Sequence, residues 1–301
     1  MLTGYTLFFG RKKMERDLGV LWEWKYDEKF IELLDSRCEK SGKTSYLISS
    51  HNLEESMEKM RKGELEFEVV LDRASGSDSA FLPIIRFCQE RRVRIINDPE
   101  KTVRANNRAV MHFELIKGGI QVPHTLILTP KERINDMSLG RIGHPFVVKK
   151  AEAVGGGEGV FLSVQTVDEV NHLREMYPEE LLLIQEAVVP RLYQERRCWF
   201  RVFFVCGKVI PCFWDDLTHV YQRMSSDDEA KFLELVRITE KIHEISGLEF
   251  FSTEVAITGD RRFVVVDYVN DQCDMRFQSD TPDGVPDLVI QEIVETIVAS
   301  L

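Results

Sequence analysis

Short apolar runs alternate with amphipathic stretches through the first hundred residues, and this alternation is the strongest constraint on the fold. The strand-like runs are residues 7–9, 45–48, 67–71 and 93–96, and the stretches with helical apolar spacing are residues 30–42, 53–62 and 81–92. Strands that are each followed by a helix usually form a parallel sheet with helices on its faces. We therefore expect an α/β lobe over residues 1–97, which ends where Asn97, Asp98 and Pro99 break the pattern.

From residue 98 onward the pattern mixes helices with antiparallel hairpins, which indicates α+β lobes in place of a continuous parallel sheet. One hairpin is predicted to turn at Gly207 and another at Gly259 and Asp260. The predicted strands are residues 125–128, 145–150, 160–163, 181–186, 198–206, 208–214, 251–258 and 262–268, and the predicted helices are residues 104–117, 167–176, 227–246 and 288–301. We expect a central lobe over residues 98–185 and a carboxy-terminal lobe over residues 186–301.

Composition argues against several classes of protein. The net charge of −11 disfavours a general nucleic-acid binder, because the phosphate backbone selects for clustered Lys and Arg. No apolar run approaches the roughly 20 residues needed to span a bilayer. The amino terminus also lacks the charged start and long apolar middle of a secretion signal. The six cysteines include no CxxC pair, so we interpret them as reduced thiols of a cytoplasmic protein.

A glycine-rich turn between two predicted strands is the first candidate for a binding site. Gly155, Gly156, Gly157 and Gly159 would let backbone amides approach phosphate oxygens without a side chain in the way. The turn leads from strand to strand, whereas Walker loops and dinucleotide-binding turns lead directly into a helix. Taken alone, the turn is equally consistent with a hairpin that binds no ligand.

A lysine and an acidic set strengthen the case for a nucleotide. Lys149 ends the strand before the glycine-rich turn, where its charge can neutralise phosphate, and alternation points Lys150 to the opposite face. Glu254 lies in one strand of the last hairpin, and Asp267 and Asn270 lie at the end of the other. Pairing of the two strands would bring these oxygens together in a set that suits Mg²⁺.

The spacing of the acidic set is irregular for a strand. Side chains two residues apart share one face of a strand, whereas Asp267 and Asn270 are three residues apart. This spacing needs a β-bulge or a strand end, and we predict a bulge at Tyr268 and Val269, which would return both side chains to the same face.

Taken in order, these motifs resemble the ATP-grasp superfamily. They are most similar to the ligases that add glutamate to a ribosomal protein and to the glutathione-synthetase-like carboxylate–amine ligases. The shared frame is Asn97, Arg108, Gly119, Ile120, Pro123, Lys149, the glycine-rich turn, Gln185, Glu186, Arg201 and the acidic hairpin that ends in Asn270. The resemblance implies an ATP-grasp fold of mixed α/β and α+β class. The first lobe is similar to the pre-ATP-grasp domain that usually precedes this core.

The resemblance also implies roles for residues that would bind the nucleotide. Arg108 and Lys149 would contact its phosphates, and the glycine-rich turn would fold over them. Glu186 and Val188 would border the adenine. Arg201 would stabilise the transferring phosphoryl group.

The same resemblance implies the metal and the substrates. Glu254, Asp267 and Asn270 would hold Mg²⁺, or Mn²⁺ in its place. Arg276 and Arg223 are candidate contacts to an acidic substrate, because basic side chains suit an anion.

The implied reaction is the joining of a small-molecule or peptide carboxylate to an amine through an acyl phosphate made from ATP. Two alternatives remain open, a small-molecule kinase on the same fold and a nucleotide sensor without catalysis. Nucleic acid and membrane are not expected as partners. Neither the substrates nor the oligomeric state follow from the sequence.

Overall fold

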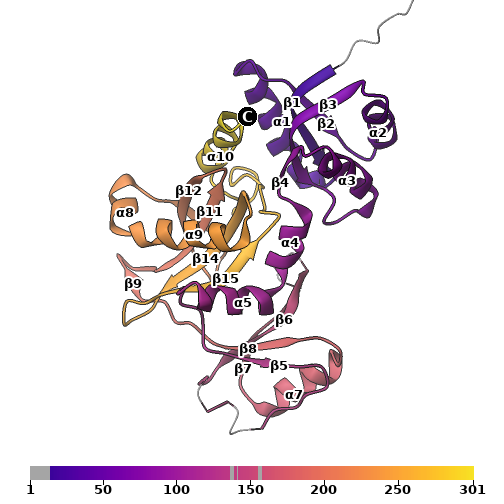
Figure 1. Ribbon diagram of the computed structural model, residues 1–301. Coiled ribbons are helices and arrows are strands. Elements are labelled where there is room, and N and C mark those ends of the chain that lie inside the picture. The colour runs from indigo at the N-terminus through magenta and orange to yellow at the C-terminus, as the bar shows by residue number, and fades with distance from the viewer. Residues whose placement is uncertain (1–13, 136–138, 141, 155–157) are drawn as a thin grey trace, which may run out of the picture. The chain divides into compact units, whose positions relative to one another are not determined.

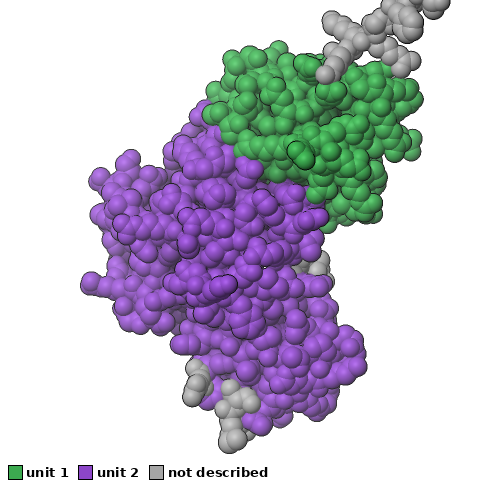
Figure 2. Space-filling view, viewed as in Figure 1, with its two compact units in different colours: residues 1–96, 297–301 green, residues 97–296 purple. Residues whose placement is uncertain are grey.

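The computed structural model of the chain describes residues 14–135, 139–140, 142–154 and 158–301. The chain divides into two compact units (Figures 1 and 2). Unit 1 contains the residues up to 96 together with 297–301, and unit 2 contains residues 97–296. The strand expected at residues 7–9 lies outside the described residues. The division of the chain into three lobes stays a prediction.

Unit 1 contains a four-stranded parallel sheet with the strand order β2-β1-β3-β4, which confirms the predicted parallel arrangement. Its elements are β1 (Met14–Trp22), η1 (Lys25–Asp27), α1 (Glu28–Lys40), β2 (Ser45–Ile48), α2 (Leu53–Arg61), β3 (Leu65–Arg73), η2 (Ser79–Phe81), α3 (Leu82–Glu90) and β4 (Arg94–Ile96). Strand β1 was not predicted. Glu15, Arg16 and Asp17 interrupt its apolar character, and only residues 18–21 of the strand are fully buried.

A buried ion pair joins the end of β3 to the turn before α1 in unit 1. The guanidinium of Arg73 donates two hydrogen bonds of 2.7 Å to the carboxylate of Asp27, and both side chains are almost fully buried. The guanidinium also lies over the ring of Phe30, 5.2 Å from its centroid. The carboxylate of Asp27 thus places a negative charge directly against the buried guanidinium of Arg73.

We predict that Asp27→Asn destabilises unit 1 by about 3–5 kcal/mol, because the change removes the negative charge that faces the buried guanidinium of Arg73. Urea unfolding would measure the loss. Glu32→Gln, on the exposed side of α1, is the matched control and should stay within about 0.5 kcal/mol of the native chain. Similar losses from both changes would contradict the role assigned to the buried pair.

Unit 2 contains two antiparallel sheets. The four-stranded sheet has the order β5-β8-β6-β7, and the five-stranded sheet has the order β13-β12-β11-β14-β15. The strands of the first are β5 (Thr125–Leu128), β6 (Phe146–Val154), β7 (Glu158–Val164) and β8 (Leu182–Glu186), and those of the second are β11 (Trp199–Val205), β12 (Lys208–Trp214), β13 (Tyr221–Arg223), β14 (Phe250–Ile257) and β15 (Phe263–Asn270). Both predicted hairpins are confirmed.

Several helices begin in unit 2, and the last of them extends into the residues of unit 1. They are α4 (Pro99–Asn106), α5 (Arg108–Lys117), α7 (Val167–Met176), α8 (Ser226–Lys231), α9 (Leu233–Ser246) and α10 (Asp287–Ala299), and two short strands, β9 (Leu192–Tyr193) and β10 (Arg196–Arg197), form a separate ribbon. Helix α9 runs across one face of the five-stranded sheet (Figure 1), where Leu235 and Ile242 share a core with Phe200, Val202 and Phe251. Because side chains alternate along a strand, Arg201, which lies between Phe200 and Val202, points to the other face.

Two long helices predicted from the sequence are each broken in two. Residues 104–117 were expected to be one helix, but Asn107 has extended backbone and its side chain caps α5 by accepting a hydrogen bond from the amide of Val110. Residues 227–246 were also expected to be continuous, but the chain breaks between α8 and α9 at Phe232, whose ring is buried in the core. In the described part of the chain, no helix combines the length and apolar character that crossing a bilayer requires.

Candidate functional site

A row of facing residues crosses the whole five-stranded sheet. In order from β13 to β15, it consists of Arg223, Cys212, Arg201, Glu254 and Asp267. Residues directly opposite each other on antiparallel strands place their side chains on the same face. The row therefore collects two arginines and two carboxylates on the face that α9 does not cover. The predicted proximity of Glu254 and Asp267 is confirmed.

Two register shifts flank Asp267 in β15. Ser252 faces Asn270 and Glu254 faces Asp267, so two residues of β14 span the same distance as three of β15. The extra residue lies where the bulge was predicted, at Tyr268 and Val269, and it aligns Asp267 and Asn270 with the same face of β14. The second shift lies on the other side of Asp267, at Val266.

Lys149 reaches from the four-stranded sheet to this second bulge. Its ammonium donates a 2.8 Å hydrogen bond to the carbonyl of Val266, and the residue is only 7% exposed. Burial lowers the pKa of Lys149, and the nearby Asp267 carboxylate opposes that effect. Lys150 points elsewhere, to an ion pair of 3.1 Å with Glu180. The two lysines therefore lie on opposite faces of β6, as predicted.

Arg108 lies close to Lys149 as well. It begins α5, and its guanidinium donates a 3.0 Å hydrogen bond to the backbone carbonyl of Lys150. Its charge contributes to the lowered pKa of Lys149, after the larger effect of burial. The structure therefore brings together the two cations that were predicted to contact phosphate.

Part of the predicted glycine-rich turn can be described. Gly155, Gly156 and Gly157 lie outside the described residues. Gly159, in β7, has a positive φ of +75°, and a Cβ atom built there would lie 2.8 Å from the side chain of Lys150. A residue with a side chain would be strained at this position and would also collide with Lys150, so glycine is required here for structural reasons.

Arg201 and Glu254 form a buried ion pair in the centre of the row. One carboxylate oxygen of Glu254 accepts from Arg201 and the other accepts a 3.1 Å hydrogen bond from the indole of Trp199. Burial raises the pKa of Glu254, and the charge of Arg201 opposes this. For Arg201, burial is the largest single effect and disfavours the charge, but the combined attraction of Glu254, Tyr221, Asp267 and Cys273 outweighs it and the pKa is raised. Among the described residues, the buried Nε atom of Arg201 has no hydrogen-bond partner.

The three predicted metal ligands differ in whether their side-chain oxygens accept hydrogen bonds from the protein. Within the described residues, no donor bonds to the Asp267 carboxylate or to the side-chain oxygen of Asn270, and both residues are half-buried. Glu254 has both oxygens engaged by protein donors. No group of three or more His, Cys, Asp or Glu in this part of the chain is placed to hold a metal ion. Of the three residues, Asp267 and Asn270 therefore have the side-chain oxygens best suited to bind Mg²⁺, and the remaining ligands would come from outside the protein.

Glu186 and Val188, the predicted border of the adenine, lie at and just beyond the end of β8. The backbone amide of Glu186 donates a 2.9 Å hydrogen bond to the carbonyl of His124. The neighbouring Gln185 is buried and donates a 2.7 Å hydrogen bond to the hydroxyl of Tyr268, next to Asp267. The strand predicted to border the adenine is thus bonded to the strand that carries the predicted metal ligands.

This hydrogen bond belongs to a buried polar chain that sequence reasoning missed. The Tyr268 hydroxyl also lies 2.7 Å from Nδ1 of His112, and Gln185 donates a second bond of 3.1 Å to the hydroxyl of Thr125. Burial lowers the pKa of His112 to about 4. The one signal in the sequence was a tyrosine placed inside the acidic motif, and it is indistinguishable from an ordinary core aromatic.

The two arginines predicted to meet a substrate are engaged in local ion pairs. Arg223 lies 2.8 Å from Glu292, and Arg276 lies 2.6 Å from Asp274 and 3.0 Å from Asp283. The hydrogen bond with Asp274 is the largest cause of the raised pKa of Arg276. Both residues therefore have a structural role, and their contact with a substrate stays a prediction.

Comparison of the sequence with family models and with curated proteins gives no match. Solved structures match nearly the whole chain. A RimK-domain ATP-grasp protein from Sphaerobacter thermophilus is 19% identical with a TM-score of 0.65, over 93% of this chain and 99% of that one. D-alanine–D-alanine ligase from Bacillus anthracis, complexed with ATP, is 14% identical with a TM-score of 0.64, over 95% and 97%. The ATP-grasp ligase PsnB, complexed with the precursor peptide PsnA2 and AMPPNP, is 13% identical with a TM-score of 0.64, over 96% and 98%.

The chain therefore has the ATP-grasp fold, and the mixed α/β and α+β class predicted from the sequence is confirmed. Proteins of one fold can differ in activity, so the reaction has to be argued from the site itself.

We predict that Lys149→Ala weakens ATP binding by about 1–3 kcal/mol, the usual scale for losing a charge-assisted contact. Isothermal titration with ATP and Mg²⁺ would measure the change. Lys150→Ala is the matched control, because its ammonium points away toward Glu180, and it should leave the affinity nearly unchanged. Equal losses from the two changes would contradict the assignment of Lys149 to the phosphates.

Proposed function

We propose that this protein is an ATP- and Mg²⁺-dependent ligase that activates a carboxylate as an acyl phosphate and joins it to an amine. The observation that supports the proposal is the hydrogen bond from the ammonium of Lys149 to the carbonyl of Val266, in the bulge beside Asp267. A cation from one sheet and oxygen ligands from the other are thereby held at one place. A nucleotide triphosphate bound with a divalent metal needs both.

The structural neighbours support this choice of reaction. The B. anthracis protein is named as a ligase and is complexed with ATP. PsnB is named as an ATP-grasp ligase, and one of its complexes contains Mg and ADP. The macrocyclase MdnC from Microcystis aeruginosa is bound to the precursor peptide MdnA. We infer a carboxylate of a small molecule or of a peptide as one substrate and an amine as the other.

In the proposed reaction a carboxylate oxygen attacks the γ-phosphorus of ATP and ADP leaves, giving an acyl phosphate. The amine nitrogen then attacks the acyl carbon, inorganic phosphate leaves, and the nitrogen loses a proton. Lys149 and Arg108 would bind the phosphates, and Glu186 and Val188 would border the adenine. Mg²⁺ would neutralise phosphate charge when held by the metal ligands. The protein's part is to position the reactants and to stabilise charge.

Arg201 would act on the transferring phosphoryl group from its place in the row. Its guanidinium is held by Glu254 and by the hydroxyl of Ser252 at 3.3 Å, and it lies over the ring of Trp214 at 5.0 Å. These contacts fix its orientation in advance, so little conformational entropy would be lost when it meets the phosphoryl group. Glu254 would then serve mainly to orient Arg201 and only secondarily as a metal ligand.

A nucleotide sensor without catalysis is the second candidate. The observation that favours it is that Arg201 and Trp199 engage both oxygens of Glu254, which leaves the metal fewer protein ligands. A kinase on the same fold has no comparable observation in its favour.

Trapping with hydroxylamine separates these three functions. With ATP, Mg²⁺ and a pool of carboxylic acids and short peptides, we expect ADP release and accumulation of a hydroxamate, because hydroxylamine captures an acyl phosphate in place of the amine. A ferric-ion colour assay and mass spectrometry would detect the hydroxamate. A kinase would release ADP and give a phosphorylated alcohol without hydroxamate. A sensor would bind ATP with no turnover in any pool, and that result would reject the ligase.

We predict that Asp267→Asn lowers the rate of ATP turnover by about 100-fold or more, since losing even an outer contact of a metal site costs about 10–100-fold. Circular dichroism and the melting temperature would verify that the variant is folded. Asp227→Asn, an exposed carboxylate of α8, serves as the control and should retain full activity. Native turnover by the Asp267 variant would remove this residue from the metal site.

A further inference from the structure

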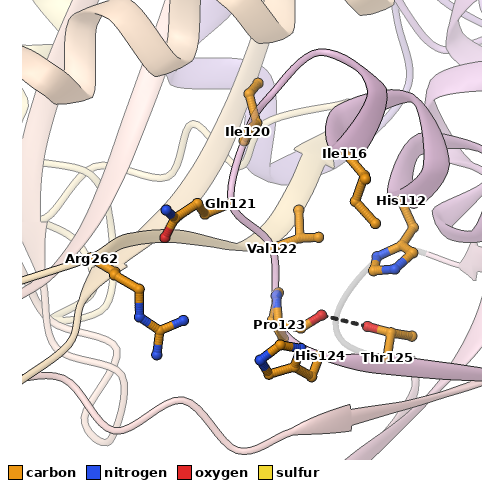
Figure 3. A pocket seen from close by; sticks show the side chains of 9 residues that line it. All are labelled: His112, Ile116, Ile120, Gln121, Val122, Pro123, His124, Thr125 and Arg262. Carbon is orange, nitrogen blue, oxygen red and sulfur yellow. Dashed lines mark hydrogen bonds between the residues drawn. The ribbon is translucent and has the colours of Figure 1, made fainter. Parts of the chain in front are cut away.

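Unit 2 contains a pocket that none of the predicted site residues lines. Its volume is about 410 Å³, and nine residues from α5, the segment between α5 and β5, the start of β5 and the β14–β15 hairpin surround it (Figure 3): His112, Ile116, Ile120, Gln121, Val122, Pro123, His124, Thr125 and Arg262. This volume lies in the range of about 300–1,000 Å³ that is typical of small-molecule sites.

The chemistry of the lining suits an anion with an apolar body. Among the described residues that line the pocket, the titratable side chains are two histidines and one arginine, and none is a carboxylate, in a chain whose net charge is −11. Arg262 bonds to Asp260 through Nε at 2.7 Å, and Figure 3 shows its other guanidinium nitrogens toward the pocket, across from His124. Ile116 and Val122 supply an apolar wall on the opposite side. A planar guanidinium favours a carboxylate as its partner.

Backbone hydrogen bonds join the segment that forms one wall of the pocket to the strands of the candidate functional site. The carbonyl of Gln121 accepts a 2.9 Å hydrogen bond from the amide of Val265, two residues before Asp267. The carbonyl of His124 accepts another of 2.9 Å from the amide of Glu186, which is predicted to border the adenine. A ligand that shifts this wall therefore acts directly on both β15 and the end of β8.

The buried polar chain makes a second connection. His112 and Thr125 both line the pocket, and they are the two ends of the chain that passes through Tyr268 and Gln185. Tyr268 lies between the predicted metal ligands Asp267 and Asn270 in the sequence. The pocket and the candidate site thus share hydrogen-bonded partners through side chains as well as through backbone.

We propose that this pocket is a second ligand site, which binds a compact carboxylate with an apolar body and thereby changes the affinity of the candidate site for ATP. The binding of the carboxylate is independent of the proposed function, whereas its effect on ATP rests on that function. Coupling between two sites is reciprocal, so ATP would change the affinity for the carboxylate by the same factor.

Fluorine NMR with para-(trifluoromethyl)benzoate as the probe tests the binding. The probe should bind the native chain, and Arg262→Gln should weaken it by about tenfold or more, since a charge-assisted contact is lost. Arg261→Gln changes the exposed neighbouring arginine of the same turn and should leave the affinity unchanged. The uncharged para-(trifluoromethyl)benzamide should bind much more weakly. Equal binding of the amide, or full affinity in the Arg262 variant, would overturn the carboxylate site.

Two further measurements test the coupling. In amide NMR spectra without nucleotide, the signals of Val265 and Glu186 should shift on titration with the benzoate in the native chain and not in Arg262→Gln. The benzoate should then change the ATP affinity by a factor in the range of about 5–150. If the benzoate and ATP both bind without affecting each other, the coupling is wrong. If the benzoate binds and ATP does not, the proposed function fails while the second site stands.

Discussion

The hydrogen bond made by the buried ammonium of Lys149 is the interaction on which the arrangement of unit 2 depends. A charged group with 7% exposure needs hydrogen-bond acceptors or an opposite charge nearby. Lys149 finds the carbonyl of Val266 at 2.8 Å and the carboxylate of Asp267 close to it. Because Lys149 belongs to the four-stranded sheet and Val266 to the five-stranded sheet, this hydrogen bond joins the two sheets at the candidate site, as the bond from Gln185 to Tyr268 also does.

The irregular register of β15 explains why that acceptor is available. Strand β15 is an edge strand of its sheet and pairs there with β14, and a bulge leaves the extra residue without a facing residue in that neighbour. Val266 is such a residue, and the other shift, between Asp267 and Asn270, places both side chains on the face of β14 that carries Glu254 and Ser252. Regular strand pairing is therefore interrupted next to the residues whose side-chain oxygens are predicted to bind the metal. The opposite face of the same sheet keeps an uninterrupted apolar core under α9.

Local patterns in the sequence predicted the fold well and the partners of charged groups poorly. Strand and helix periodicity can be recognised within a few residues, so the parallel sheet and the hairpins followed from it. The bulge beside Asp267 was predicted instead from the three-residue spacing of the two expected metal ligands. Strand β1 was not predicted, because its charged first half hides the apolar pattern. The helix break at Asn107 was not predicted either, and it depends on the side chain of Asn107, which caps α5. The ion pairs of Arg223 and Arg276 and the bond between Tyr268 and Gln185 join residues that spacing alone does not relate.

The partners of the cations indicate which of them can take up phosphate. Arg201 is bound to the buried carboxylate of Glu254, and separating a buried pair leaves an uncompensated charge at a cost of several kcal/mol. Lys149 and Arg108 instead donate the hydrogen bonds observed in the described part of the chain to backbone carbonyls. Exchanging a neutral carbonyl for a phosphate oxygen strengthens the bond and leaves no carboxylate unpaired. These two residues would therefore bind the nucleotide first, while Arg201 would keep its carboxylate and act from a fixed position.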